Sequence, residues 1–401
     1  MKNVIKIFFV MMTITESCKK PYSPQIIAAD NGYLVVEGLI NSGQDSTFIK
    51  LSRTVQLSSK STLRPELNAL VTIESDQNNT YTLQGDSTGL YSAPQLNLAA
   101  NAKYRLRIKT VSNREYLSDY IATKATPEID SISYRVQNNG VQFYVNTHDP
   151  QNKTIYYRWD FNETWKYVSF HRSFFKLDSN GYPTFRVNYR TSDNIYECYR
   201  SDNSHQVLLG SSAKLGQDVI SMYPIDFITA QSGKVSYGYS FLLREYALTA
   251  DAFDYWQNLK KNTEQLGSVF DAQPSSLPSN VHCTTNPNEP VVGYLSVSSV
   301  TSKRIFVDHI NINLFTPAYI EPPDAGACEQ KIIKVDPQES FHDRLDKTFR
   351  TGDSTLVNAQ YVLGNNGPVV VGYFYAPTEC VDCRTKTPFG TPAIPAYWPY
   401  Q

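Results

Sequence analysis

The sequence predicts a mostly β protein, in which an N-terminal β-sandwich is followed by a larger β-rich domain with one packed α-helix. The first observation is a series of short apolar or alternating segments, spaced about ten residues apart and separated by turn residues. The second is that aromatic residues, which favour strands, make up 13% of the chain. The third is a single segment, near residues 249–266, in which apolar residues recur at helical spacing.

The N-terminus has the order of a secretory signal. Lys2 and Lys6 are followed by an apolar stretch over residues 7–14, which is far shorter than the ~20 residues that span a bilayer as a helix. Cys18 comes directly after the small residue Ser17, as in a lipobox, where the thiol is acylated and becomes the new N-terminus. The alternative is an ordinary signal peptide with an incidental cysteine.

The lipobox interpretation divides the start of the chain into two segments. Residues 1–17 are the predicted lipoprotein signal peptide, and residues 18–31 are a predicted tether that begins with lipidated Cys18. Two or more acyl chains on one cysteine are sufficient for a stable membrane anchor. Removal of the signal peptide leaves basic and acidic side chains nearly in balance, so the sequence predicts no nucleic-acid partner.

Residues 32–126 form the predicted sandwich domain. Its seven strands alternate or run apolar for four to six residues each, and turn residues separate them. The stretch from Asp86 to Tyr91, followed by Tyr104, is similar to transthyretin-like sandwiches, and the strand count also suits an immunoglobulin-like one. The predicted strands cover residues 34–38, 48–52, 69–73, 80–83, 89–91, 103–108 and 116–121.

Pro127 marks the start of the second predicted domain, residues 127–401. A hairpin is expected over residues 129–145, because Asn138-Asn139-Gly140 is a turn sequence between two alternating runs. Two aromatic strands, residues 156–161 and 165–168, are predicted to follow. A further long strand is predicted within residues 235–246.

The predicted helix has an N-cap and one apolar face. Thr249 can cap it, and its apolar residues recur every three or four positions. An isolated helix of this length is marginal in water, so this face should pack on a sheet. We expect Trp256 to be a core residue within an apolar stripe that comprises Ala252, Phe253, Tyr255, Trp256 and Leu259.

The cysteines predict disulfides in an exported chain. After Cys18, five remain, namely Cys198, Cys283, Cys328, Cys380 and Cys383, and an odd number leaves at least one thiol without an intrachain partner. A zinc site would need a second C-x-x-C pair, and a redox site would need a thioredoxin-like strand and helix around the first. The sequence therefore favours a local disulfide between Cys380 and Cys383, with Cys283–Cys328 or Cys198–Cys283 as a further pair.

No catalytic, metal or cofactor site is predicted. His282, His309 and His342, taken with Cys283 and Cys328, match no ligand spacing. Glu163, between Trp159 and Trp165, is the best-placed carboxylate for a glycosidase, but such a site needs a second carboxylate at a defined distance. We interpret Glu163 instead as a charged residue in a hairpin between two aromatic strands. The abundant tyrosines suit a binding surface.

Several blocks of the sequence resemble a family of lipoproteins of Bacteroidota, the domain-of-unknown-function family 4249. The similar blocks include Val35-Val36-Glu37-Gly38-Leu39-Ile40, Tyr157-Arg158-Trp159, Glu163-Thr164-Trp165, residues 255–275, Gly293-Tyr294, Lys303-Arg304-Ile305-Phe306 and the closing Cys380 and Cys383 with Pro395 and Trp398. The resemblance implies a lipid-anchored outer-membrane protein without enzymatic activity.

The same resemblance implies an accessory or ligand-capturing partner of a TonB-dependent outer-membrane transporter. Lys19 and Lys20 stand where acidic residues commonly mark export to the outer face, so both the cell surface and the periplasmic face stay open. Two other functions stay open as well: an adhesin or structural envelope protein, and a hydrolase with an unrecognised site.

Overall fold

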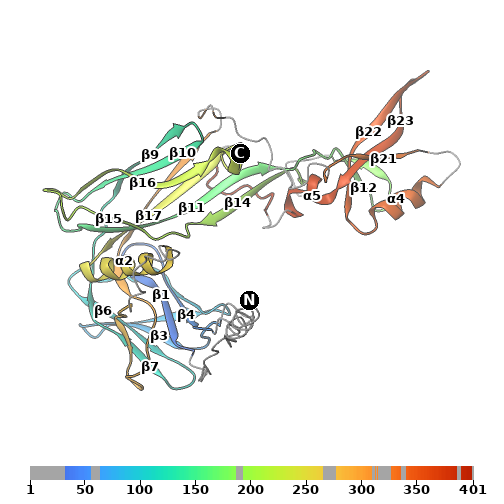
Figure 1. The fold of residues 1–401 in the computed structure, drawn as a ribbon. Helices are drawn as coiled ribbons and strands as arrows, with labels where there is room; N and C mark the ends of the chain where they lie inside the picture. Colours follow the sequence, from blue (N-terminus) through green and yellow to red (C-terminus); the bar gives the residue numbers. More distant parts are fainter. Residues whose placement is uncertain are drawn as a thin grey trace, which may run out of the picture.

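The computed structural model describes residues 32–55, 64–186, 193–264, 277–308, 312, 314, 327–335, 340–385 and 390–399. The protein is mostly β, as the sequence predicts. Its described residues form three parts, an N-terminal sheet, a central sandwich and an elongated arm (Figure 1). The predicted signal peptide, Cys18 and the tether up to residue 31 lie outside the described residues. No helix among the described residues is long and apolar enough to cross a membrane.

The N-terminal sheet contains all seven strands predicted before residue 122. It runs in the order β18-β7-β6-β3-β4-β5-β2-β1-β19, with β8 paired to β6. The sheet curls around one apolar core that includes Leu34, Ile49, Ile73 and Tyr104. Its strands are β1 (Leu34–Asn41), β2 (Thr47–Arg53), β3 (Leu70–Ser75), β4 (Thr80–Gly85), β5 (Leu90–Ala93), β6 (Lys103–Lys109), β7 (Glu115–Ser118), β8 (Ile121–Ala122), β18 (Val281–Cys283) and β19 (Ser296–Ser298).

Two of these strands come from far along the chain. β18 pairs antiparallel with β7, where Cys283 lies opposite Tyr116. β19 pairs parallel with β1, where Val297 lies opposite Ile40. Strand pairing therefore divides the chain differently from the predicted ranges 32–126 and 127–401, because residues 281–298 complete the first sheet.

The central sandwich packs a three-stranded sheet, β16-β10-β9, against a five-stranded one, β14-β11-β17-β20 with β15 paired to β11. The rings of Phe143 and Phe241 stack between the two sheets with centroids 4.6 Å apart. The predicted hairpin is present as β9 and β10, joined at Gln137 and Gly140. The strands are β9 (Ile129–Gln137), β10 (Gly140–His148), β11 (Tyr156–Val168), β14 (Glu197–Asn203), β15 (Leu208–Ser211), β16 (Val219–Thr229), β17 (Tyr239–Leu248) and β20 (Val300–Val307), and a 3₁₀ turn, η1 (Ala230–Ser232), follows β16.

The predicted hairpin at Glu163 is wrong. Residues 156–168 form one continuous strand, β11, which pairs with β17 from Tyr156 through Trp165. The side chains alternate across this strand, so the aromatic residues at odd positions face the core of the sandwich. Glu163 shares that inward face and is buried.

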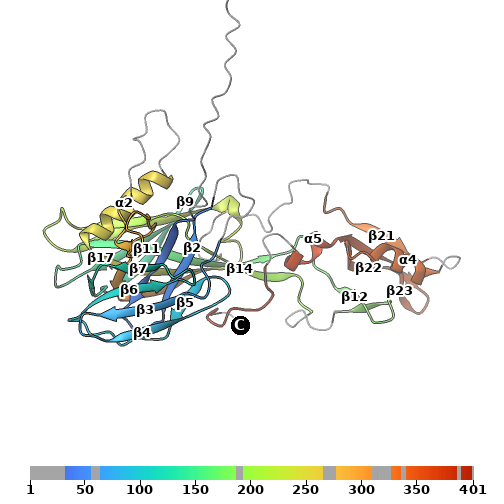
Figure 2. The ribbon, with the colours of Figure 1, turned by 90° about the horizontal axis from the view of Figure 1, so that it is seen from below.

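The helix α2 (Ala250–Glu264) joins the N-terminal sheet to the central sandwich (Figures 1 and 2). Thr249 caps it, because its Oγ1 accepts the N–H of Ala252 at 3.2 Å. Phe253 meets Tyr156 of β11 at 4.8 Å between ring centroids. On the other side, Tyr255 meets Tyr294, which precedes β19, at 5.1 Å.

The prediction that Trp256 is a core residue is wrong. Ala252 and Tyr255 are the buried residues of the helix, whereas Trp256 is half-buried. Its ring packs on the guanidinium of Arg158, whose Cζ lies 4.6 Å from the ring of Trp256 and 4.1 Å from the ring of Tyr246. The apolar stripe is therefore narrower than the sequence suggests, since an arginine covers one edge of it.

The arm extends away from the body in both views (Figures 1 and 2). A three-stranded sheet, β21-β23-β22, forms its centre. Phe175 of β12 packs on Tyr373 of this sheet, with ring centroids 5.4 Å apart. The elements of the arm are β12 (Phe175–Leu177), β13 (Pro183–Phe185), β21 (Lys331–Lys334), α4 (Phe341–Phe349), β22 (Ser354–Gly364), β23 (Gly367–Pro377), α5 (Thr378–Val381) and η2 (Cys383–Thr385).

Two disulfides hold the base of the arm, and the predicted pairing is wrong in detail. Cys383 bonds Cys198 of β14, and Cys380 bonds Cys328, with Cα atoms 5.9 and 5.6 Å apart. Cys380 lies on α5 and Cys383 on η2, and Asp382 between them is extended, so the two thiols face different neighbours. Neither Cys380–Cys383, nor Cys283–Cys328, nor Cys198–Cys283 forms. Cys283 is the free thiol among the described residues, as the odd count requires.

Candidate ligand-binding site

Two neighbouring hollows open at one end of the N-terminal sheet, and residues 288–290 line both of them. The larger, about 340 Å³, is lined by residues of the loop and strand between Leu277 and Val291. The smaller, about 160 Å³, is lined by Gly32, Tyr33, Arg114, Asn286, Asn288, Glu289 and Pro290. We call the two hollows together the Glu289 site, because Glu289 lines both.

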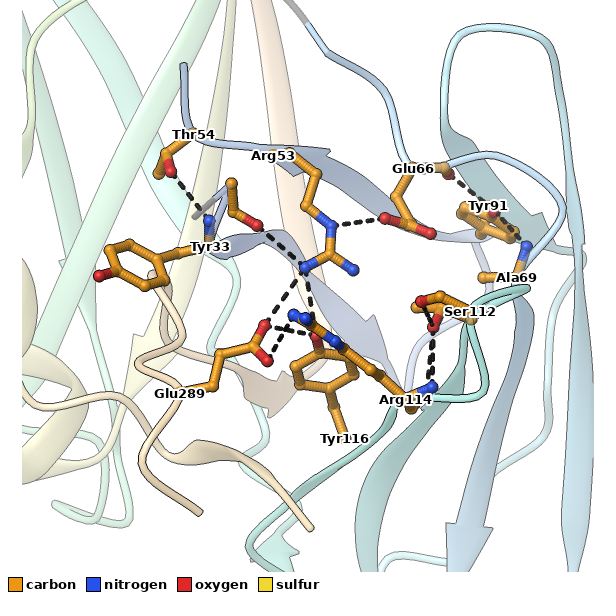
Figure 3. A network of polar contacts seen from close by, with 12 residues as sticks. Tyr33, Arg53, Thr54, Glu66, Ala69, Tyr91, Ser112, Arg114, Tyr116 and Glu289 are labelled. Atoms are coloured by element: carbon orange, nitrogen blue, oxygen red, sulfur yellow. Dashed lines mark hydrogen bonds and ion pairs between the residues drawn. The ribbon is translucent and has the colours of Figure 1, made fainter. Parts of the chain in front are cut away.

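Glu289 is held by three donors from two strand regions, Arg53 of β2, Arg114 just before β7 and Tyr116 of β7 (Figure 3). Its Oε2 accepts Nη1 of Arg114 at 2.7 Å. Its Oε1 accepts the hydroxyl of Tyr116 at 2.7 Å and Nη1 of Arg53 at 3.3 Å. The Glu289 side chain is 4% exposed, and a carboxylate this deeply buried is commonly paired in this way.

Arg53 connects this carboxylate to the rest of the sheet end. Its Nη1 also donates to the carbonyl of Gly32 at 3.1 Å, and its Nε donates to Glu66 at 2.6 Å. Tyr33 is fixed nearby, because its N–H donates to Thr54 Oγ1 at 3.0 Å. The network therefore sets the position of Gly32 and Tyr33 as well as that of Glu289.

The contacts of the network raise the pKa values of its two arginines, so both guanidinium groups stay protonated. The hydrogen bond to Tyr116 and the charge of Glu289 raise the pKa of Arg114 above its usual value. Burial alone would lower the pKa of Arg53, but Glu66 and Tyr116 outweigh this effect and raise it. Burial, together with the hydrogen bond to Glu289, raises the pKa of the Tyr116 hydroxyl, which therefore stays protonated. Two guanidinium groups and two carboxylates leave the network close to neutral.

The segment that carries Glu289 is fixed by short local bonds. The N–H of Glu289 donates to the carbonyl of Asn286 at 2.9 Å and so closes a turn. Farther on, Gly293 adopts φ +125°, and a side chain there would approach the carbonyl oxygen of Val36 to 2.0 Å. Only glycine allows the segment to lie this close to β1.

The exposed groups of the Glu289 site are neutral or already paired. Asn286 and Asn288 are exposed, and each amide can both donate and accept. The side chain of Arg114 is 48% exposed and carries further N–H donors beyond its bond to Glu289. The ring of Tyr33 borders the same hollow. This arrangement suits a neutral ligand rich in hydroxyl or amide groups.

Glu163, the carboxylate that the sequence analysis considered for catalysis, lies in the central sandwich and already has partners. Glu163 forms an ion pair with Lys234 and accepts the hydroxyl of Tyr239 at 2.7 Å. Burial and the charge of Glu163 raise the pKa of nearby Asp226 to about 6. Glu163 lines neither hollow of the Glu289 site, and its partners hold it inside the central sandwich.

The histidines and cysteines that the sequence analysis considered as metal ligands lie in different parts of the structure. His282 and Cys283 line the larger hollow, but His342 lies on α4 in the arm, and Cys328 is disulfide-bonded. His309 lies outside the described residues. Within the described part of the chain, no three His, Cys, Asp or Glu side chains form a group that could hold a metal ion.

A third hollow, of about 400 Å³, lies in the central sandwich. It is lined by β14 residues, from Tyr199 to Asp202, and by Gly390, Thr391 and Pro395. Thr391 exchanges two backbone hydrogen bonds with Tyr199, so the segment near the C-terminus forms one wall.

Sequence reasoning missed the residues of the Glu289 site. Arg53, Arg114 and Glu289 are separated by 61 to 236 positions, and single charged residues give no periodic signal. The signal present in the local sequence was the turn-forming run Asn286-Pro287-Asn288-Glu289-Pro290, in which a carboxylate lies between Pro287 and Pro290. The pairing of β18 with β7 brings the segment that carries Glu289 beside Arg114 and Tyr116.

The fold and the site define a β-rich protein of several parts with a polar hollow at one end. A family model described as "Domain of unknown function (DUF4249)" matches residues 19–304. The chain therefore belongs to the DUF4249 family, as the sequence blocks indicated. The matched range covers the N-terminal sheet and most of the central sandwich, and it ends within β20, before β21 of the arm. No curated protein matches the chain.

Proposed function

We propose that the protein is a non-catalytic lipoprotein, anchored in the outer membrane through Cys18, that captures a neutral polar ligand for a TonB-dependent outer-membrane transporter. The observation that carries the proposal is the Glu289 site, where a buried ion network positions exposed amides and an aromatic ring around two hollows. The larger hollow is of the size at which small-ligand pockets begin.

The charge of the site supports a neutral ligand. Arg114 and Arg53 share the carboxylate of Glu289, and Arg53 also binds Glu66, so neither an anion nor a cation meets an uncompensated partner. Hydroxyl and amide groups can both donate and accept, as can the amides of Asn286 and Asn288. Oligosaccharides and uncharged peptides share this chemistry.

The position of the site supports capture near a membrane. Gly32, which lines the smaller hollow, follows Cys18 by 14 residues, and a chain of that length spans at most about 50 Å. A ligand bound there would stay close to the membrane that holds Cys18. We favour this role over hydrolysis because Glu163, the carboxylate nominated from the sequence, is buried and ion-paired.

The lipid anchor is tested by removing the proposed acylation site. The Cys18→Ser variant should appear in the soluble fraction, whereas Cys283→Ser, which removes a different thiol, should stay with the membranes. Fractionation of cells that make each full-length variant gives the answer. A Cys18→Ser protein that remained tightly bound to membranes would contradict the lipid anchor.

Ligand capture is tested by calorimetric titration with two probe sets, neutral oligosaccharides and uncharged peptides of matched length. Wild-type protein should bind members of one set, and Asn288→Ala should weaken that binding at least tenfold. Gln77→Ala, which removes an exposed amide from the same sheet away from the hollows, should bind normally. Binding that is unaffected by Asn288→Ala, or absent for both sets, would contradict the proposed ligand class.

A further inference from the structure

The hairpin β22–β23 ends in an apolar tip that projects beyond the rest of the arm (Figure 1). Residues 354–377, which form the whole hairpin, include no Asp, Glu, Lys, Arg or His. Near the turn, Tyr361, Val362, Leu363 and Val369 are 46, 47, 91 and 53% exposed. Exposed apolar groups gathered in this way mark an interaction surface more often than singly scattered ones do.

The apolar side chains lie on both faces of the tip. Tyr361 and Leu363 share one face, since alternate residues of a strand point the same way. Val362 and its cross-strand partner Val369 lie on the other face. Among the described residues, β21 pairs with β23 only at Tyr375 through Gly372, so the tip beyond is a two-stranded ribbon. Such a ribbon is marginal by itself in water.

One edge of the ribbon is open to a further strand. Pro368 removes a backbone donor from β23 near the turn, which blunts that edge. β22 carries no proline and no charge, the two features that usually protect an edge strand. In the described part of the chain, no strand pairs with β22 on its outer side from Gln360 to Gly364.

We propose that this tip docks into an apolar, uncharged groove of a partner protein, with a strand of the partner added to the β22 edge. The row of backbone donors and acceptors on that edge needs a strand, and apolar walls on two sides would cover both faces of the ribbon. The lack of charge means that no charged group of the tip has to lose its water.

Two other occupants fit the tip less well. A lipid bilayer would leave the backbone groups of the open edge unpaired and would bury the amides of Asn365 and Asn366 at the turn. A second copy paired edge to edge would cover only one edge of each ribbon. Such pairing would leave the apolar faces of each ribbon exposed to water.

The test is photo-crosslinking in cells that make the full-length protein, with a benzophenone amino acid placed at Leu363. The matched control carries the same probe at Val111, an apolar residue in the turn between β6 and β7 that is 74% exposed. We expect one major protein adduct at position 363 and none at position 111. The cross-linked peptide of the partner should contain an uncharged stretch of at least five residues.

A second variant ties the adduct to the tip. Val362→Lys places a charge on the face opposite Leu363 and should reduce the adduct at least tenfold, whereas Val111→Lys should leave it unchanged. Both variants alter exposed side chains, and an unchanged melting temperature confirms that they fold. A lipid adduct, an adduct of two copies of this chain, equal adducts at both positions or no adduct would each overturn the proposal, as would a partner peptide that is charged.

Discussion

Glu289 Oε2 lies 2.7 Å from Nη1 of Arg114, although 175 residues separate the two along the chain. Glu289→Gln removes the buried charge that Arg53 and Arg114 share, and breaking such a pair commonly costs about 3–5 kcal/mol. Arg114→Gln should cost less, about 1 kcal/mol, because Arg53 and Tyr116 still hold the carboxylate. Urea denaturation of both variants measures the difference. Equal losses would show that Glu289 does not depend on its other partners.

Glu245 should make the stability of the protein fall as pH rises. Burial raises the pKa of this carboxyl from 4.5 to about 7, although Trp159 and Thr147 donate hydrogen bonds to it. The folded state therefore binds more protons than the unfolded state between these pH values, and it loses up to about 3 kcal/mol of stability from pH 4.5 to pH 7.

Glu245→Gln should remove most of this slope, since an amide does not titrate. Asp226, whose pKa burial raises to about 6, should leave a smaller slope of the same sign. Thermal unfolding at half-unit steps of pH compares the two proteins. Parallel pH profiles for wild type and variant would mean that folding does not shift the pKa of Glu245.

The disulfides should be found as Cys198–Cys383 and Cys328–Cys380. Proteolysis without reductant, followed by mass spectrometry, should give these two linked peptides. Alkylation of the unfolded, unreduced protein should label Cys283. The double variant Cys198→Ser/Cys383→Ser should loosen the arm and expose its base to protease, because that bond ties η2 to β14. A peptide linking Cys380 to Cys383 would contradict this arrangement.

The helix α2 should be fixed by Tyr255 more than by Trp256. Tyr255 is buried against Tyr294, so Tyr255→Ala should cost about 3–5 kcal/mol, as for other large buried aromatics. Trp256→Ala mainly loses a half-exposed contact with Arg158, worth about 1 kcal/mol. Chemical denaturation distinguishes the two. A larger loss for Trp256→Ala would restore it as the residue that fixes the helix.

The sequence predicted what depends on local periodicity. The seven N-terminal strands, the hairpin at Asn138–Gly140 and the helix from Ala250 follow from alternation, turn residues and a cap. It did not predict the return of Val281–Ser298 to the first sheet, because pairing between distant strands leaves no periodic trace. Likewise, Cys380 and Cys383 are close in sequence, yet the backbone at Asp382 is extended and the two thiols bond different partners, Cys328 and Cys198.

The candidate site was beyond sequence reasoning for the same reason. Glu163 was the best-placed catalytic carboxylate in the sequence because two tryptophans flank it. Its partners in the structure, Lys234 and Tyr239, are more than 70 positions away. Glu289 showed no motif, and its role depends on Arg53 and Arg114 in two other strand regions. Both carboxylates take their ion-pair partners from distant parts of the chain, and the local sequence does not reveal those partners.

Amide hydrogen exchange with and without a bound probe tests the central claim most directly. The probe is whichever neutral oligosaccharide or uncharged peptide the titration selects, added at saturation to the full mature chain. Slower exchange is expected in peptides that cover residues 32–36, 112–116 and 286–291, which surround the Glu289 site. Protection confined to residues 199–202 and 390–395 would place the ligand in the third hollow and contradict the account.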